Sequence, residues 1–280
     1  MTKHRFATAA VGLIAAITLS ACAGSIGPTQ TDTLQVPMPA NKTQTWDFEL
    51  DLGAASVSVG SSGESLVQGS IEYNVPALKP VATIGDRSVV VRQEFSGILP
   101  VNTRNDWRLQ FGRGLPMNLT VNTGASSGKW ELGGLSLRRF AWTQGAADAT
   151  LQFSEPNPAE LDSLTVNGGA ASLTMRGLAN ANIRSANVTA GAGAITLYFD
   201  GQLSQSVSIT LDGGVSSIAI YSGGNPIRLT LDSKLNAINN SGWQESGNTY
   251  SSPEWATAAG PKITIRARLG VASLNLIAGR

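Results

Sequence analysis

The sequence contains one histidine, His4, and one cysteine, Cys22. A single cysteine excludes a disulfide within the chain. His4 lies so close to the N-terminus that removal of a leader ending at Ala21 leaves no imidazole at all. Such a chain has no Ser-His or Cys-His nucleophile pair, no histidine general base and no histidine-ligated zinc.

Charged residues are also scarce, at 14% of the sequence. Without residues 1–21 the chain keeps 18 basic and 19 acidic side chains, a net charge of −1. A balance this close to zero provides no electrostatic footprint for nucleic acid, so we expect no nucleic-acid partner. Glycine, serine, threonine and alanine are abundant, which is typical of β proteins with many tight turns.

The N-terminus has the layout of a secretory signal peptide. Lys3, His4 and Arg5 precede an apolar run over residues 6–17, which is too short to span a bilayer. Leu19-Ser20-Ala21-Cys22 then resembles the lipobox of bacterial lipoproteins, and this resemblance implies cleavage before Cys22 and its acylation. We therefore predict a signal peptide over 1–21 and an extracytoplasmic protein anchored in a membrane through lipid on Cys22, at the cell surface or in the periplasm. The alternative is an ordinary signal peptide followed by an incidental cysteine.

Residues 22–45 are rich in Pro, Thr, Gln and Ala without a sustained period, and we expect a flexible tether there. From Trp46 onward, apolar and polar residues alternate with a period of two, which predicts half-buried strands. Examples of the inward pairs are Val57/Val59, Leu119/Val121, Ile195/Leu197 and Ile263/Ile265.

A glycine followed by small residues recurs at intervals of about 21 to 24 residues, at Gly124, Gly145, Gly169, Gly191 and Gly213. Each interval has room for two strands and two turns. A fixed period of this length indicates a repeat architecture, in which stacked units bury one another's apolar side chains. We predict an all-β, single-chain β-solenoid with coils of about 22 residues and two short strands each. A β-sandwich is the alternative, although it does not require the repeated glycine.

Two longer stretches carry a family resemblance. Residues 50–93, beginning LDLGAASVSVG, and residues 105–140, beginning NDWRLQFGRG, resemble the N-terminal module of the bacterial "toast rack" lipoproteins. The segment GVASLNLI at 270–277 resembles adhesin-like β-solenoid modules and the C-terminal domain of LiaF-type envelope-stress proteins. The resemblance implies a surface-anchored all-β protein and brings no catalytic residues. We expect a toast-rack-like β module over 46–111 and solenoid repeats over 112–280, with a loop-rich insertion at 233–262.

Candidate chemical motifs are weak. Gly124, Ser126 and Gly128 match the text of a nucleophile elbow, and Ser126 with Lys129 matches Ser-x-x-Lys, but both motifs need a helix where we expect a strand. Asp212 and Asp232 each end a strand, and on neighbouring coils they could share a calcium ion. Two carboxylates are too few for a site, so we expect no metal and no cofactor.

The aromatic residues form two groups. Trp107, Trp130, Phe140 and Trp142 keep the parity of inward residues. Trp243, Tyr250 and Trp255 lie in 233–262, where alternation is unclear. An exposed cluster there could stack on sugar rings or dock a partner, whereas the alternative is that the segment caps one end of the solenoid.

These features favour a non-enzymatic binding, adhesion or structural module of the bacterial envelope. In addition to the membrane, its expected partner is a cell-wall glycan or an envelope protein. One alternative is a LiaF-like regulator that contacts a membrane signalling protein. A third is a polysaccharide-active enzyme, which needs clustered carboxylates with arginines. The available bases are Arg138, Arg139, Arg266 and Arg268, of which the last two are predicted to face outward as a solubilising surface.

Overall fold

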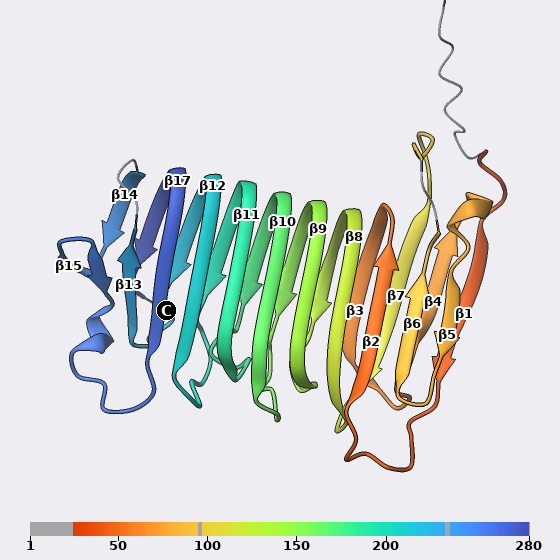
Figure 1. Ribbon diagram of the computed structural model, residues 1–280, viewed down its shortest axis with the longest axis horizontal. Coiled ribbons are helices and arrows are strands. Elements are labelled where there is room, and N and C mark those ends of the chain that lie inside the picture. Colours follow the sequence, from red (N-terminus) through yellow and green to blue (C-terminus); the bar gives the residue numbers. More distant parts are fainter. Residues whose placement is uncertain (1–24, 95–96, 233–235, 280) are drawn as a thin grey trace, which may run out of the picture.

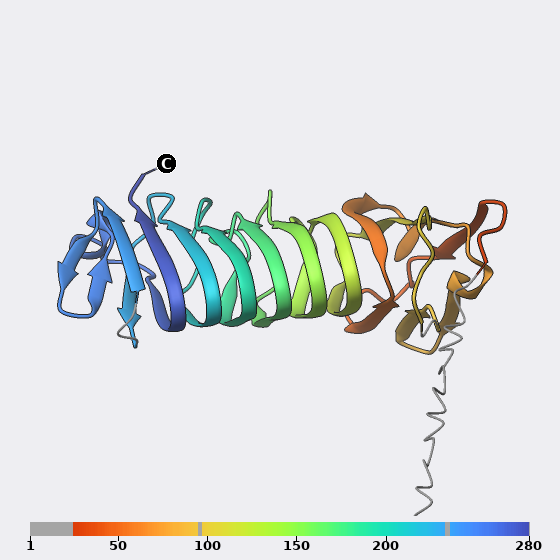
Figure 2. The same cartoon turned by 90° about the horizontal axis from the view of Figure 1, so that it is seen from above.

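The computed structural model describes residues 25–94, 97–232 and 236–279. In this part of the chain, seventeen strands form one continuous sheet that winds along an elongated molecule (Figures 1 and 2). The helices described are two short 3-10 turns, η1 (Pro76–Leu78) and η2 (Pro253–Trp255). No helix in the described ranges is long and apolar enough to cross a bilayer. The all-β prediction is confirmed.

Long parallel strands make up the centre of the molecule and stack along its axis (Figure 1). Phe140 faces Leu164 in the next strand, Leu164 faces Ala186, Ala186 faces Ile209, and Ile209 faces Ile265. These partners are 24, 22, 23 and then 56 residues apart in the chain. The strands are β8 (Pro116–Glu131), β9 (Ser136–Gln152), β10 (Leu161–Arg176), β11 (Ile183–Tyr198), β12 (Val207–Tyr221) and β17 (Ile263–Ile277).

Each of these strands is one continuous element that bends near its middle (Figure 2). In β11, Val188 and Ala190 are buried before the bend and Ile195 and Leu197 after it, while residues 191–194 are exposed. The ladder with β12 continues past this bend, because the small residues there let neighbouring backbones remain paired. The sequence predicted two short strands where the structure has one bent strand.

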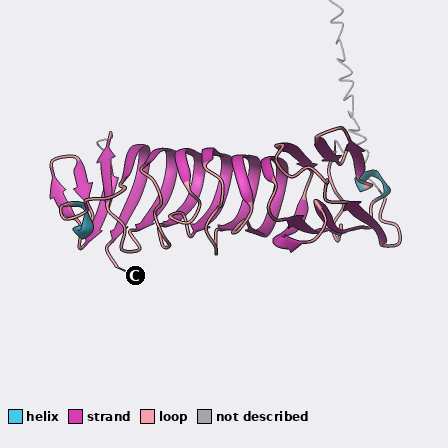
Figure 3. Cartoon of the chain, turned by 90° about the horizontal axis from the view of Figure 1, so that it is seen from below, coloured by secondary structure: helices cyan, strands magenta, loops and turns pink. Residues whose placement is uncertain are grey.

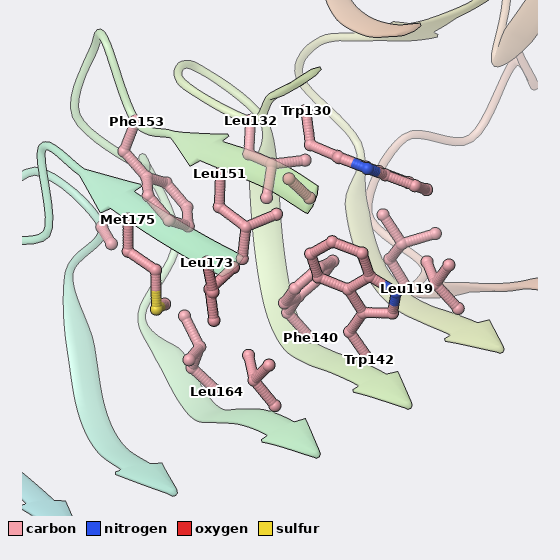
Figure 4. Close-up of a cluster of buried hydrophobic side chains, with 14 of the residues drawn as sticks. Leu119, Trp130, Leu132, Phe140, Trp142, Leu151, Phe153, Leu164, Leu173 and Met175 are labelled. Atoms are coloured by element: carbon pink, nitrogen blue, oxygen red, sulfur yellow. The ribbon is translucent and has the colours of Figure 1, made fainter. Parts of the chain in front are cut away.

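The concave side of the bent strands encloses the core (Figure 4). Trp107, Trp130, Phe140 and Trp142 are all buried, so their inward placement is confirmed. The rings of Trp130 and Trp142 lie 5.5 Å apart between centroids. Burying one large apolar side chain contributes about 1.5–3 kcal/mol, so these inward rows are the main source of stability.

Loops close the remaining side of the stack (Figure 3). Buried Asn157 satisfies the loop backbone across neighbouring turns: its amide nitrogen donates to the carbonyls of Leu137 and Ala159, and its oxygen accepts from the Leu137 N–H. Asn225 repeats the pattern by donating to the carbonyl of Phe199. Buried backbone groups outside the ladder need such partners, and asparagine supplies both a donor and an acceptor.

A column of glycines runs along the bend. A Cβ on Gly145 would lie 2.6 Å from the carbonyl oxygen of Gly124, and a Cβ on Gly169 would lie 2.7 Å from that of Gly145. The column continues through Gly191, and then through Gly214 rather than the predicted Gly213. Each turn leaves no room for a side chain on the next, which is why the glycines repeat.

We expect Gly169→Ala to lower the free energy of unfolding by about 1–3 kcal/mol, because the added methyl group forces stacked backbones apart. Gly53 is the matched control, since a Cβ built there has nothing within 4 Å. Thermal unfolding of both variants checks this. Equal melting temperatures for Gly169→Ala and Gly53→Ala would contradict the close approach.

Shorter strands build the N-terminal end. β2 and β3 pair in parallel with the two halves of β8, which joins this end to the stack. β6 lies beside β2, and β7 lies between β3 and β4. The strands are β1 (Gln30–Val36), β2 (Trp46–Leu52), β3 (Ala55–Gly63), β4 (Val67–Tyr73), β5 (Val81–Ile84), β6 (Ser88–Arg92) and β7 (Asn105–Gly112).

β1 corrects the prediction of a flexible tether over 22–45. Its residues Gln30–Val36 pair antiparallel with β4, and Leu34 and Val36 are buried in the core. The Gly27 N–H also donates to the carbonyl of Asn74, at 2.7 Å. The strand could not be recognised in this segment, because polar and proline residues dominate and only two apolar side chains face inward.

At the other end, the final strand of the chain lies inside the stack. β17 pairs on one side with β12, and on the other with β13 along its first half and β14 along its second. β16 pairs antiparallel with β13 and forms a hairpin with β15. The outermost elements are β13 (Ile227–Leu231), β14 (Asn236–Ser241), β15 (Gln244–Ser246) and β16 (Thr249–Ser251).

Candidate functional site

The three aromatic residues considered for binding do not form an exposed cluster. Trp243 is 5% exposed and Tyr250 4%, and both belong to the core. Burial, reinforced by Glu245, raises the pKa of the Tyr250 hydroxyl, which donates to that carboxylate at 3.3 Å. The binding hypothesis is therefore wrong for Trp243 and Tyr250, because the segment after β13 folds over the end of the stack. Trp255, in η2, remains partly exposed.

Asp212 and Asp232 are not on neighbouring strands, because β17 lies between them. Arg268 of β17 donates to Asp212 at 2.7 Å, and Arg266 of β17 donates to Asp232 at 2.5 Å. The hydrogen bond to Asp212 raises the pKa of Arg268. The structure thus gives each carboxylate an arginine in place of the shared calcium ion considered from the sequence. In the described ranges, no group of three or more His, Cys, Asp or Glu could hold a metal ion.

Ser126 and Lys129 lie within strand β8, so the helix that both nucleophile motifs require is missing at this position. The Ser126 hydroxyl donates to the Thr123 hydroxyl at 3.2 Å. Neither motif is formed. Cys22, the predicted lipidation site, lies outside the described residues.

A hollow of about 350 Å³ lies on the outer face of β12, β17 and β13, where Ile209 and Ile265 line it together with polar side chains. Its walls combine hydroxyl groups with two guanidinium groups and one carboxylate, because outward positions of the three strands lie in register. Ser208 is opposite Thr264, which is opposite Arg228; Thr210 is opposite Arg266, which is opposite Thr230. The polar lining residues are Ser208, Thr210, Arg228, Thr230, Asp232, Thr264 and Arg266.

Trp255 holds one arginine of this hollow in position. The Arg228 guanidinium carbon lies 4.2 Å from the centroid of the Trp255 ring, and its Nε donates weakly to Ser251 at 3.4 Å. Lys262 lies 4.8 Å from the same centroid and donates to the Trp255 carbonyl. Among the described residues, neither cation forms an ion pair, and Asp232 is bound to Arg266. The hollow can therefore accept an anionic group.

Sequence reasoning missed this hollow. Strand parity predicted that Arg266 faces outward, which is confirmed by a side chain that is 69% exposed. The same parity applied to Ile227 and Leu229 would have turned Arg228 outward. The pairing of β13 with β17 had no signal in the sequence.

The profile of the family described as the N-terminal domain of toast_rack, DUF2154, matches residues 25–176. This match covers more than half of the chain. The chain belongs to this family. The match of the toast-rack domain ends with β10, so the hollow lies beyond it. A search of curated proteins finds no match to this toast-rack family member.

One solved structure shares the fold. A candidate cell adhesion protein from Clostridium sporogenes matches the toast-rack chain with a TM-score of 0.52 at 15% identity, covering 90% of this chain and 100% of the other. A candidate adhesin from Parabacteroides merdae matches with a TM-score of 0.38 at 11% identity, over 90% of this chain and 97% of the other. At 15% identity the likeness to the Clostridium structure concerns the fold alone.

Proposed function

We propose that this toast-rack family member is a lipid-anchored, extracytoplasmic and non-enzymatic binding module of the bacterial envelope. The observation that carries the proposal is the hollow on β12, β17 and β13, near one end of a long molecule. β1, which begins eight residues after Cys22, lies at the other end (Figure 1). The sequence supports the absence of catalysis, since no histidine follows His4 and no cysteine follows Cys22. The adhesion role named for the Clostridium structure is consistent with binding.

The attachment point is close to the folded part. Five peptide steps separate Cys22 from Gly27, whose N–H is already bound to Asn74, and five steps span at most about 18 Å. Lipid on Cys22 would therefore hold the N-terminal end near the bilayer. The strands that line the hollow, β12, β17 and β13, lie toward the other end of the stack (Figure 1), so the hollow would be far from the anchored end.

Cys22→Ser is expected to move the protein from the membrane fraction to the soluble fraction, because the residue that carries the lipid is lost. Ser25→Ala, three residues away, is the control and should stay with membranes. Fractionation followed by immunoblotting checks both. Membrane association of Cys22→Ser at the wild-type level would mean that the anchor is elsewhere.

A regulatory role, in contact with a membrane protein, is the second candidate. Ile26, just before β1, and Ile98 and Val101, between β6 and β7, are exposed, the last two by 70% and 85%. Exposed apolar side chains near a membrane anchor are suited to a protein partner.

Binding assays on glycans and cell wall, and photocrosslinking in cells, separate the candidates. Binding to a glycan array and to isolated cell wall supports the binding module. Silence in both, with photocrosslinks from position 98 or 101 to a membrane protein, supports regulation. Turnover of a polysaccharide that a single Asp substitution abolishes would instead establish an enzyme.

A further inference from the structure

Two rows of uncharged polar side chains cross the first halves of β10, β11 and β12 on their outer face and lead into the hollow. The row that contains Ser208 continues into β11 and β10 as Ser185 and Ser163, and the row that contains Thr210 continues as Asn187 and Thr165. Adjacent strands lie about 4.8 Å apart, so each row repeats a hydroxyl or amide group at that spacing. Neither row carries a charge within β10, β11 and β12; beyond these strands the serine row reaches Arg139 of β9 on one side and Arg228 on the other.

Two arginines stand at the β13 and β17 end of the rows. Arg228 and Arg266 line the hollow, Lys262 packs with Arg228 against Trp255, and Asp232 pairs with Arg266. Arg228 makes no ion pair with any described residue, and its flat guanidinium is held against the Trp255 ring. A planar fork held this way matches a carboxylate. Packing against the Trp255 ring already orders the Arg228 side chain, so ligand binding costs less conformational entropy.

We propose, resting on the binding function above, that the hollow binds the carboxylate of an acidic polysaccharide. Arg228 and Arg266 hold the carboxylate, and the sugar chain lies across β12, β11 and β10 along the serine and threonine–asparagine rows. Hydroxyl and amide groups match the hydroxyls of successive sugars.

Polygalacturonate and its methyl ester form a matched pair of probes that differ in the carboxylate charge. The full-length protein in detergent is expected to bind polygalacturonate and to bind the ester at least about tenfold more weakly, because hydrogen bonds between charged groups are lost. Binding should also weaken as salt is raised. Equal affinity for both polymers overturns the assignment of a carboxylate.

Arg228→Gln and Arg266→Gln are each expected to weaken polygalacturonate binding about tenfold or more, with an unchanged melting temperature. Arg108→Gln is the control, since Arg108 lies on β7 at the N-terminal end of the molecule and pairs with Glu72. Wild-type affinity in Arg228→Gln, or an equal loss in Arg108→Gln, overturns the site.

The rows have their own test. Thr165→Val with Asn187→Leu is expected to weaken binding of the polymer several-fold while leaving trigalacturonate unaffected, because a trimer reaches only the hollow and its nearest strands. Equal effects on both probes overturn the proposed path of the chain.

Failure of the inference can be told apart from failure of the proposed function. Binding only to neutral glycans refutes the carboxylate and keeps the binding module. If polyphosphate binds as tightly as polygalacturonate, the hollow is a general anion site and not a site for an acidic glycan. No binding to polygalacturonate, alginate or hyaluronate overturns the inference, and silence across the glycan array overturns the binding module as well.

Discussion

Ile195→Asp is expected to prevent folding. Ile195 is 1% exposed and faces inward after the bend of β11, where it lies between Leu173 of β10 and Ile218 of β12. An aspartate there has no partner and must be either buried as a charge or protonated. We expect a loss of more than about 4 kcal/mol, against a net stability of about 5–15 kcal/mol for a typical domain. Thermal unfolding and near-ultraviolet circular dichroism measure the effect.

Ala194→Asp is the matched control, because position 194 is exposed and turns outward. Asp148 of β9 already occupies the same column, two strands away, opposite Ser172 of β10, which in turn faces Ala194. The control therefore places a carboxylate where the fold already has one, and its melting temperature should stay close to that of the wild type. A wild-type melt of Ile195→Asp would refute the inward placement.

These two neighbouring positions show what could be predicted from the sequence. The direction of a side chain depends on strand parity, which is local, so the inward pairs Ile195/Leu197 and Ile263/Ile265 are confirmed. The repeated glycines could also be predicted, because each avoids a local clash between a side chain and the backbone of the preceding turn. The bend within a continuous strand could not be predicted, because the same glycine and alanine residues are expected in a turn that separates two strands.

The order of strands in space could not be predicted, because it depends on which edges pair. We assumed that the turns stack in chain order, which placed Asp212 beside Asp232. In the structure β17 lies between them, although 56 residues separate Asp212 from Arg268. The candidate site depends on this insertion, since Arg266 comes from β17 and Arg228 from β13. The prediction of a flexible tether was wrong for another reason: β1 has only two buried residues, too few to produce a clear alternation of apolar and polar residues.

Deleting β17 is expected to abolish folding, although it lies at the end of the sequence. A stop after Lys262 removes Ile263, Ile265, Leu269, Leu274 and Leu276, all buried. Their burial is worth on the order of 10 kcal/mol, which is comparable to the net stability of a whole domain. The deletion also leaves unpaired edges on β12, β13 and β14, which have hydrogen bonds to β17 in the complete chain. Soluble yield and dye binding to exposed apolar surface report the outcome.

A stop after Ala278 is the control, because it keeps β17 and the hydrogen bond from the Ala278 N–H to Ser241. Stability in a repeat protein is close to a sum over neighbouring units, so removing a terminal unit usually shortens the stack and leaves the rest folded. That behaviour is expected only if the last strand is outermost. A chain ending at Lys262 that unfolds cooperatively near the wild-type temperature would contradict the inserted strand, and with it the hollow that β17 helps to form. Misfolding of this chain, with a folded control, would mean that β13 and β14 cannot reach their native pairing until the final strand has been made.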